Sequence, residues 1–169
     1  PALLAPQLRS ALLRLSRSAA AKSFAERGLR ALAGFARALK VKYGDIEVGV
    51  DLEPEAGVAD NGDLEQDLTS LLETVGVAAA KADTALVMFV DALQYVEEDE
   101  LAALITALHR CAQRKLPITL IGAGLPHLRG KLGEAKSYAE RLFEFPEIGP
   151  LTPEAAALAI TKPASDAGV

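Results

Sequence analysis

The spacing of hydrophobic positions divides the chain into helical and strand-like segments. Leucines recur every three or four residues over 2–20, and Phe and Leu do so over 23–40, which predicts two amphipathic helices. A similar apolar stripe over 64–81, preceded by Asp63 as an N-cap, predicts a third helix. We expect the first two helices to form a hairpin that lies on an apolar surface.

Two kinds of strand follow from the pattern. Apolar and acidic or glycine positions alternate over 46–52, which predicts a half-buried strand with an acidic outer face. The run 84–91 is almost entirely apolar until its final aspartate, which predicts an inner strand of a parallel sheet with both faces buried. The shorter runs 118–121 and 142–145 predict two further strands.

Helix signals separate these strands. Acidic residues crowd 97–100 and basic residues 110–115, as expected for the two ends of one helix, and Pro117 ends it. A further helix is predicted over 133–142, and Thr152 followed by a proline starts the last one. Strands that alternate with helices at this spacing predict an α/β fold, with right-handed crossovers, a parallel sheet and helices on both of its faces.

Charge is distributed unevenly along the chain, although the net charge is only −5. Residues 1–42 carry nine Lys or Arg and one acid, whereas residues 43–100 carry sixteen Asp or Glu and one base. Either the two segments pack near each other or form solvated faces, or the basic arm meets an anionic partner. We expect no nucleic-acid partner, because aromatic residues for base stacking are few and the acidic segment would repel phosphate.

Cysteine content and hydropathy indicate the compartment in which we expect the protein. The single cysteine, Cys111, excludes an internal disulfide and favours a reducing, cytoplasmic compartment. No run reaches the roughly 18 apolar residues of a membrane span, so we expect no membrane partner. Because the chain begins at Pro1 without methionine, we expect it to be a processed or excised piece.

Three positions are candidates for chemistry. Asp91 follows a predicted strand, where α/β sheets bind ligands, and could hold a hydrated Mg²⁺ against phosphate oxygens; alternatively it caps the next loop. Gly122 and Gly124 could bring backbone amides near an anion, or could supply a turn that needs positive φ. Arg141 is either a cation at a helix C-terminus or an arginine offered to the phosphate of a neighbouring subunit.

Several segments together resemble prokaryotic AAA-type ATPases, the stand-alone ATP-binding proteins related to archaeal and replication-initiator ATPases. The resemblance covers most of the chain and is weakest over 1–40. It divides the chain into basic N-terminal helices (1–42) and a partial AAA-type ATPase core (43–169). The segments that carry it are Asp91-x-x-Gln94-Tyr95, the helix 100–110, Leu116–Pro126, Gly133–Phe143, Ile148–Leu151 and the acidic stretch within 45–75.

The resemblance implies a three-layer, P-loop NTPase-like sheet that binds ATP and Mg²⁺ and assembles as a homo-oligomer. It implies Asp91 as the Mg²⁺ ligand, Gly122 as the sensor-type position and Arg141 as the catalytic arginine supplied to a neighbour. Two features depart from the family: the chain has no G-x-x-x-x-G-K-[ST] loop, and Ala92 stands where the family has glutamate. We therefore expect a middle fragment, without the Walker A loop and the lid, that cannot hydrolyse ATP by itself. The alternative is a degenerate ATPase scaffold that acts as a protein-interaction module.

Overall fold

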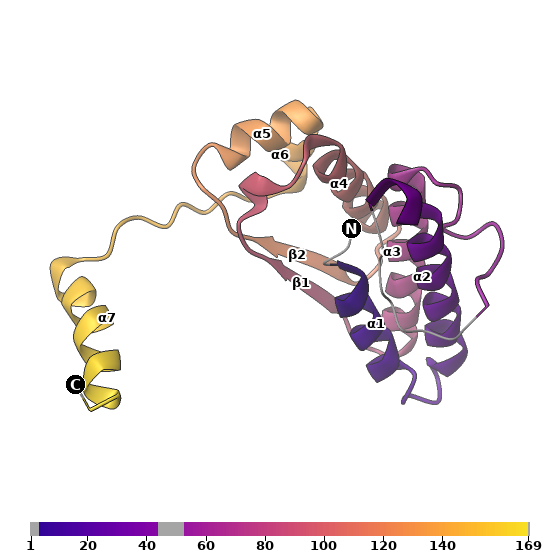
Figure 1. The fold of residues 1–169 in the computed structure, drawn as a ribbon, viewed down its shortest axis with the longest axis horizontal. Coiled ribbons are helices and arrows are strands. Elements are labelled where there is room, and N and C mark those ends of the chain that lie inside the picture. The colour runs from indigo at the N-terminus through magenta and orange to yellow at the C-terminus, as the bar shows by residue number, and fades with distance from the viewer. Residues whose placement is uncertain (1–3, 44–52, 169) are drawn as a thin grey trace.

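A computed structural model describes residues 4–43 and 53–168, and the predicted strand over 46–52 lies outside these residues. The described chain is a mixed α/β structure with a helical body, a small sheet and a helix that stands apart (Figure 1). In chain order its elements are α1 (Leu4–Leu15), α2 (Lys22–Tyr43), α3 (Leu64–Lys81), β1 (Leu86–Val90), the 3-10 turn η1 (Leu93–Tyr95), α4 (Glu98–Gln113), β2 (Ile118–Gly122), α5 (Leu128–Ala135), α6 (Ala139–Leu142) and α7 (Pro153–Asp166).

The two strands form a parallel pair, as predicted. Leu86 lies opposite Ile118 and Val90 opposite Gly122, so the strands are in register along their whole length. Helix α4 connects them, which is the crossover that parallel neighbours require. Both strands therefore end at the same edge of the sheet.

The N-terminal hairpin is also confirmed. Helices α1 and α2 pack on each other and on α3, which lies between them and α4 (Figure 1). The close approach of α1 depends on Gly28, because a Cβ there would lie 2.5 Å from Leu12 Cδ2. Leu12, Leu32 and Phe35 are fully buried in a core that extends into α3. Helix α1 is shorter than predicted and ends at Leu15.

Two aspartates fix the start of α3. The Gln66 backbone N–H donates to Asp63 Oδ1 at 2.8 Å, so the predicted N-cap is confirmed. Asp67 is fully buried and accepts hydrogen bonds from the backbone N–H groups of Asn61 and Gly62, at 3.0 and 2.9 Å. The buried carboxylate thus ties the preceding loop to the helix.

The sheet is covered on one face. Met88 points into the helical core and is 7% exposed, whereas Val87, Phe89 and Ile121 on the opposite face are 44%, 76% and 51% exposed. Helices α3 and α4 lie on the covered side (Figure 1). The prediction that β1 is buried on both faces is therefore wrong, because no described element packs on its outer face.

The region after β2 departs from its predicted structure. The helix predicted over 133–142 is interrupted at Lys136, whose backbone is extended and whose Nζ contacts Glu65 Oε2 on α3 at 2.8 Å. The strand predicted over 142–145 does not form. Phe143 and Phe145 instead pack against a small apolar cluster that contains the buried Leu93.

Helix α7 begins as predicted but packs on nothing described. The Ala155 backbone N–H donates to Thr152 Oγ1 at 3.2 Å, and Pro153 is the first helical residue. None of its residues is buried, and an irregular segment holds it away from the body (Figure 1). In residues 4–43 and 53–168 no helix has both the length and the apolarity that a bilayer crossing needs.

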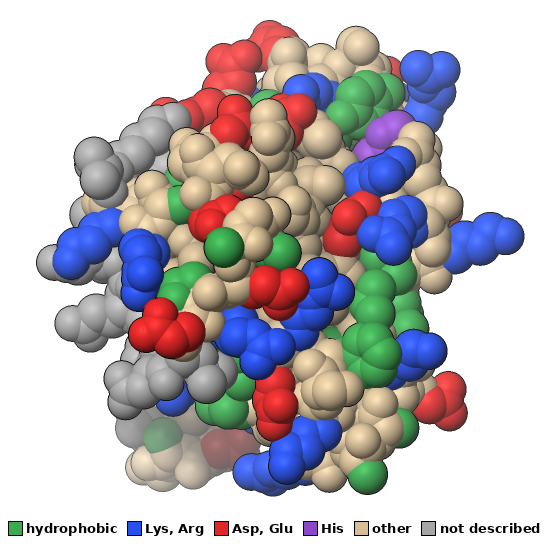
Figure 2. Space-filling view, turned by 90° about the vertical axis from the view of Figure 1, so that its right-hand side faces the viewer, with side chains coloured by type: hydrophobic (Ala, Val, Ile, Leu, Met, Phe, Trp, Pro, Cys, Tyr) green, Lys and Arg blue, Asp and Glu red, His purple; other side chains and the backbone are tan. Residues whose placement is uncertain are grey.

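Basic side chains of the N-terminal helices meet acidic side chains of the segment that follows them. Figure 2 shows them interspersed on the face that lies to the right in Figure 1. Arg27 and Arg30 of α2 approach the Glu55 carboxylate at 3.0 and 4.0 Å. The basic and acidic segments therefore meet in part, although exposed pairs of this kind stabilise a fold by only about 0–1 kcal/mol.

Candidate functional site

The first feature of the candidate site is an exposed carboxylate at the edge where both strands end. Asp91 directly follows β1 and is exposed, and the last residue of the neighbouring strand is Gly122, opposite Val90. The Ala92 backbone N–H donates to Asp91 Oδ1 at 2.8 Å. One oxygen thus caps the turn, as the alternative interpretation predicted, while the side chain stays open to solvent.

The turn after Asp91 is strained. Ala92 adopts the left-handed conformation, with φ 55° and ψ 40°. This costs an L-residue about 1–2 kcal/mol. The turn sends Leu93 inward, where it is 3% exposed and its backbone N–H donates to Ala123 O at 3.0 Å. The Ala123 N–H donates in turn to Val90 O at 2.9 Å, so the loops that follow the two strands are bonded to each other.

Packing explains the glycine at the end of β2 and the glycine two residues after it. A Cβ at Gly122 would overlap Leu93 Cδ1, and one at Gly124 would lie 2.6 Å from Leu128 Cδ2. Neither glycine has positive φ. The prediction that a turn needs positive φ at this pair is therefore wrong, and close approach by neighbouring leucines is the reason for glycine.

Lys131 of α5 holds the loop after Asp91, a role that the sequence analysis did not predict. Its Nζ donates to the carbonyl oxygen of Gln94, at 2.8 Å, and to that of Val96. The Gln94 side-chain oxygen accepts from the Leu125 N–H at 3.3 Å. Lys131 and Gln94 are 37 residues apart, so no local spacing links them. Together they fasten the β1 loop to the β2 loop and to α5.

Arg141 lies exposed on the short helix α6. Ala139 of the same helix belongs to the apolar cluster of Leu93, beneath the turn that follows Asp91. Within the described residues no ion pair or hydrogen bond joins the Arg141 guanidinium to Asp91. Glu140 does not engage Arg141 but pairs with Arg129, at 3.4 Å. Arg141 therefore presents its charge to solvent.

The residues fit one part of a Mg²⁺–nucleotide site. Mg²⁺ in proteins keeps several waters and takes one or two carboxylates together with substrate phosphates. Asp91 can supply one such carboxylate, and among the described residues no group of three or more His, Cys, Asp or Glu side chains is placed to hold a metal ion. One carboxylate is within the number of protein ligands that a hydrated Mg²⁺ bound to phosphates takes.

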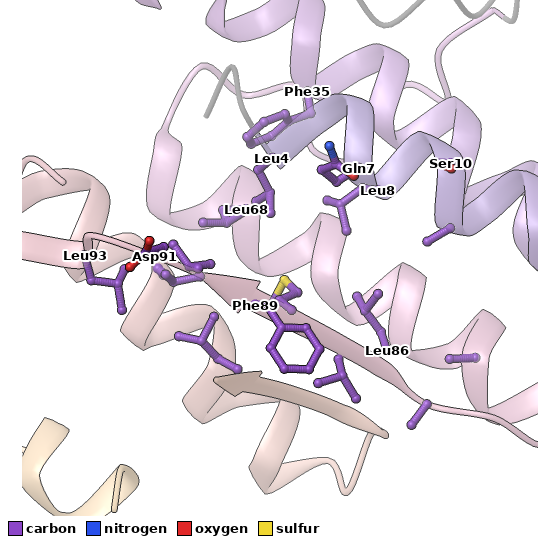
Figure 3. Close-up of a pocket in the computed structure, with 18 of the residues that line it drawn as sticks. Leu4, Gln7, Leu8, Ser10, Phe35, Leu68, Leu86, Phe89, Asp91 and Leu93 are labelled. Carbon is purple, nitrogen blue, oxygen red and sulfur yellow. The ribbon is translucent and has the colours of Figure 1, made fainter. Parts of the chain in front are cut away.

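A groove of about 1180 Å³ runs from Asp91 along β1. Figure 3 shows Leu4 and Leu8 of α1 on one side, and Leu86 and Phe89 of β1 on the other. Small-molecule pockets usually measure about 300–1,000 Å³, so this groove is large for a single small ligand. It forms between segments far apart in the chain, which is why no local sequence pattern revealed it.

The lone cysteine offers no reactive group. Cys111 is 1% exposed, and burial, assisted by the nearby Glu73 carboxylate, raises the pKa of its thiol to about 11. Thiolates and not thiols are nucleophiles, so Cys111 serves as a core residue.

The site thus consists of an exposed carboxylate, a strained turn, two tightly packed glycines and an adjoining apolar groove. The AAA-type resemblance rests on the sequence segments that carry it. No protein-family model, curated protein or solved structure matches the chain.

Proposed function

We propose that the chain is the core part of an ATP-binding AAA-type ATPase domain, in which Asp91 contacts the Mg²⁺ of bound ATP and Gly122 borders the nucleotide. The observation that supports this is the exposed Asp91 at the carboxyl end of β1, beside the end of the parallel β2. Open α/β sheets bind their ligands at this edge. The finer part of the proposal is a three-layer, P-loop NTPase-like sheet to which β1 and β2 belong.

The proposal includes no hydrolysis by this chain alone. Phosphoryl transfer depends on positioning the phosphates and stabilising their charge, and the chain has no G-x-x-x-x-G-K-[ST] loop for either task. The methyl group of Ala92 cannot orient an attacking water. A single carboxylate and a hydrated cation give weak binding, so we expect a Kd no tighter than roughly 1 mM for Mg·ATP, or about 4 kcal/mol.

Paramagnetic broadening tests the nucleotide site at this affinity. With ATP and Mn²⁺ in place of Mg²⁺, NMR signals of amides near the bound ion should broaden, and we expect this at the turns after β1 and β2. Asp91→Asn should abolish the effect. Asp83→Asn, at the opposite end of β1, is the matched control and should leave it unchanged. Broadening that survives Asp91→Asn, or that maps elsewhere, would overturn the proposal, as would a micromolar Kd by calorimetry.

Arg141 extends the proposal to an assembly of several copies. Its exposure on α6 and the pairing of Glu140 with Arg129 leave the guanidinium available to a neighbour. Guanidinium groups fork onto phosphate oxygens, which a lysine cannot match. In this homo-oligomer Arg141 would approach the nucleotide of the next copy. A cytoplasmic location agrees with the single, buried cysteine.

The second candidate is a degenerate ATPase scaffold that serves as a protein-interaction module. The apolar groove beside β1 and the exposed Phe89 favour it, because exposed apolar surface often marks a protein contact. Ala92 agrees with a scaffold that has lost catalysis. If Asp91→Asn leaves every binding property of the chain unchanged while groove substitutions do not, this function replaces the first.

A further inference from the structure

Two apolar surfaces of the chain remain uncovered in the described residues. One is the groove between α1 and β1, which Phe89 borders at 76% exposure. The other is helix α7, which has no buried residue. An apolar helix and an apolar groove are complementary, and amphipathic helices commonly bind in such grooves.

Helix α7 has a distinct apolar face. At 100° per residue, Ile160 shares one side with small apolar residues one turn before it and one turn after it, and it is 73% exposed. Leu158 lies on the other side, among the polar positions, and is 60% exposed. The apolar face consists of Ala156, Ala157, Ile160, Ala164 and Ala167, and the polar side carries Glu154, Thr161, Lys162, Ser165 and Asp166.

The segment before α7 favours binding of this helix to the groove of a neighbouring copy over binding to the groove of its own chain. Pro146 and Pro150 lie within it and Pro153 follows it, and each proline fixes its own φ at about −65° and disfavours the helical conformation at the residue before it. Proline-rich linkers act as semi-rigid spacers. Figure 1 shows the segment carrying α7 well away from the body of the chain. A stiff connection that projects a helix outward suits the exchange of that helix between two copies.

The exposed area is large enough for an extensive dimer. The accessible surface of the chain is 10464 Å², whereas a compact monomer of 17.7 kDa should expose about 7,900 Å². The excess of roughly 2,500 Å² per copy exceeds the ~800 Å² that each partner buries in a standard interface. A reciprocal exchange would cover helix and groove on both copies.

We propose that two copies of this chain exchange α7, so that the Ile160 face of one copy occupies the groove between α1 and β1 of the other. This specifies the partner in the interaction function proposed above, and it requires no nucleotide. Ile160 would insert beside the exposed Phe89 of the neighbouring copy.

Two matched substitutions on α7 test the exchange. Light scattering after size exclusion should give a dimer for the chain, a monomer for Ile160→Asp and a dimer for Leu158→Asp. Because both copies lose an apolar anchor and gain a charge in the groove, we expect the dimer Kd to rise at least 100-fold in Ile160→Asp. Circular dichroism verifies that both variants keep their helices. A monomeric wild type, or equal effects of the two substitutions, would overturn the proposal.

Disulfide trapping distinguishes the exchange of α7 between two copies from binding of α7 to the groove of its own chain. In the Cys111→Ala background, Ile160→Cys and Phe89→Cys are placed on separately tagged chains and mixed under mild oxidation. We expect a cross-link between the two tags. In the double variant on one chain, a bond that forms only within single chains would overturn the exchange. A monomer that still shows Asp91-dependent Mn²⁺ broadening would overturn this proposal alone and leave the nucleotide proposal standing.

Discussion

The Leu93 side chain occupies the space where a side chain at position 122 would begin. A Cβ built on Gly122 overlaps Leu93 Cδ1, and Leu93 is 3% exposed, so it has little room to move. The same leucine follows the strained Ala92 turn and donates its N–H to Ala123 O. The packing of this pair therefore sets the shape of the edge where Asp91 lies.

Substituting Gly122 by alanine should destabilise the fold. The added methyl group must displace Leu93 from a packed cluster, and overpacking of this kind costs about 1–3 kcal/mol in the free energy of unfolding. Gly133→Ala is the matched control, because a Cβ there meets nothing within 4 Å and lies within helix α5. Alanine at position 133 should leave stability unchanged or raise it by about 0.5–1 kcal/mol. Urea unfolding measures both, and equal effects would show that Leu93 yields freely.

A second pair of substitutions tests the buried carboxylate of Asp67. Both of its oxygens accept hydrogen bonds from the loop, and the NH₂ group of an asparagine would face a donor at one of them. Asp67→Asn should lower the free energy of unfolding by about 1–3 kcal/mol. The same change at Asp63 should cost far less, because asparagine caps a helix about as well as aspartate. If the two variants unfold at the same urea concentration, Asp67 does not hold the loop.

Whether a feature could be predicted depends on how far apart in the chain the residues that determine it lie. The cap at Asp63, the helix start at Thr152 and the two parallel strands depend on neighbouring residues and on the crossover length, and the sequence predicted all of them. The break at Lys136 depends on Glu65, 71 residues away, and therefore escaped prediction.

The candidate site shows the same limit. The position of Asp91 at the end of a strand could be predicted from one apolar run. The exposure of Phe89 could not, because it depends on whether another element packs on the sheet. The need for glycine at position 122 could be recognised only once the position of Leu93 was known. The contribution of Lys131 could be recognised only from its contact with Gln94, 37 residues away. Sequence patterns thus located the edge of the sheet but not the contacts that shape it.

Stability should fall in alkaline solution because of Cys111. Burial raises the pKa of this thiol from 9.0 to about 11 in the folded protein. Between these values the unfolded chain has lost the proton that the folded chain keeps, so the free energy of unfolding decreases as pH rises. The loss should reach at most about 3 kcal/mol for two pKa units.

The difference between wild type and Cys111→Ala isolates this contribution, because tyrosines and lysines titrate equally in both. Urea unfolding at pH 8, 9, 10 and 11 should show the wild type losing stability faster than the variant. Parallel pH profiles would mean that the thiol titrates normally. Slow reaction of the native thiol with iodoacetamide, and rapid reaction in urea, provides an independent check.

Replacing Lys131 by methionine should loosen the loop that follows Asp91. The variant keeps the apolar stem but removes the ammonium that binds the carbonyl oxygens of Gln94 and Val96. Hydrogen bonds to a charged group contribute about 1.5–3 kcal/mol, and partial exposure of this lysine should reduce the loss to about 1–2 kcal/mol. We expect faster amide hydrogen exchange at residues 93–96 and unchanged exchange in α2 and α3, because local openings affect the loop before the core. Lys162→Met on the exposed helix α7 is the control and should change neither region. Uniformly faster exchange along the chain would show instead that Lys131 supports the whole fold and has no specific hold on the Asp91 loop.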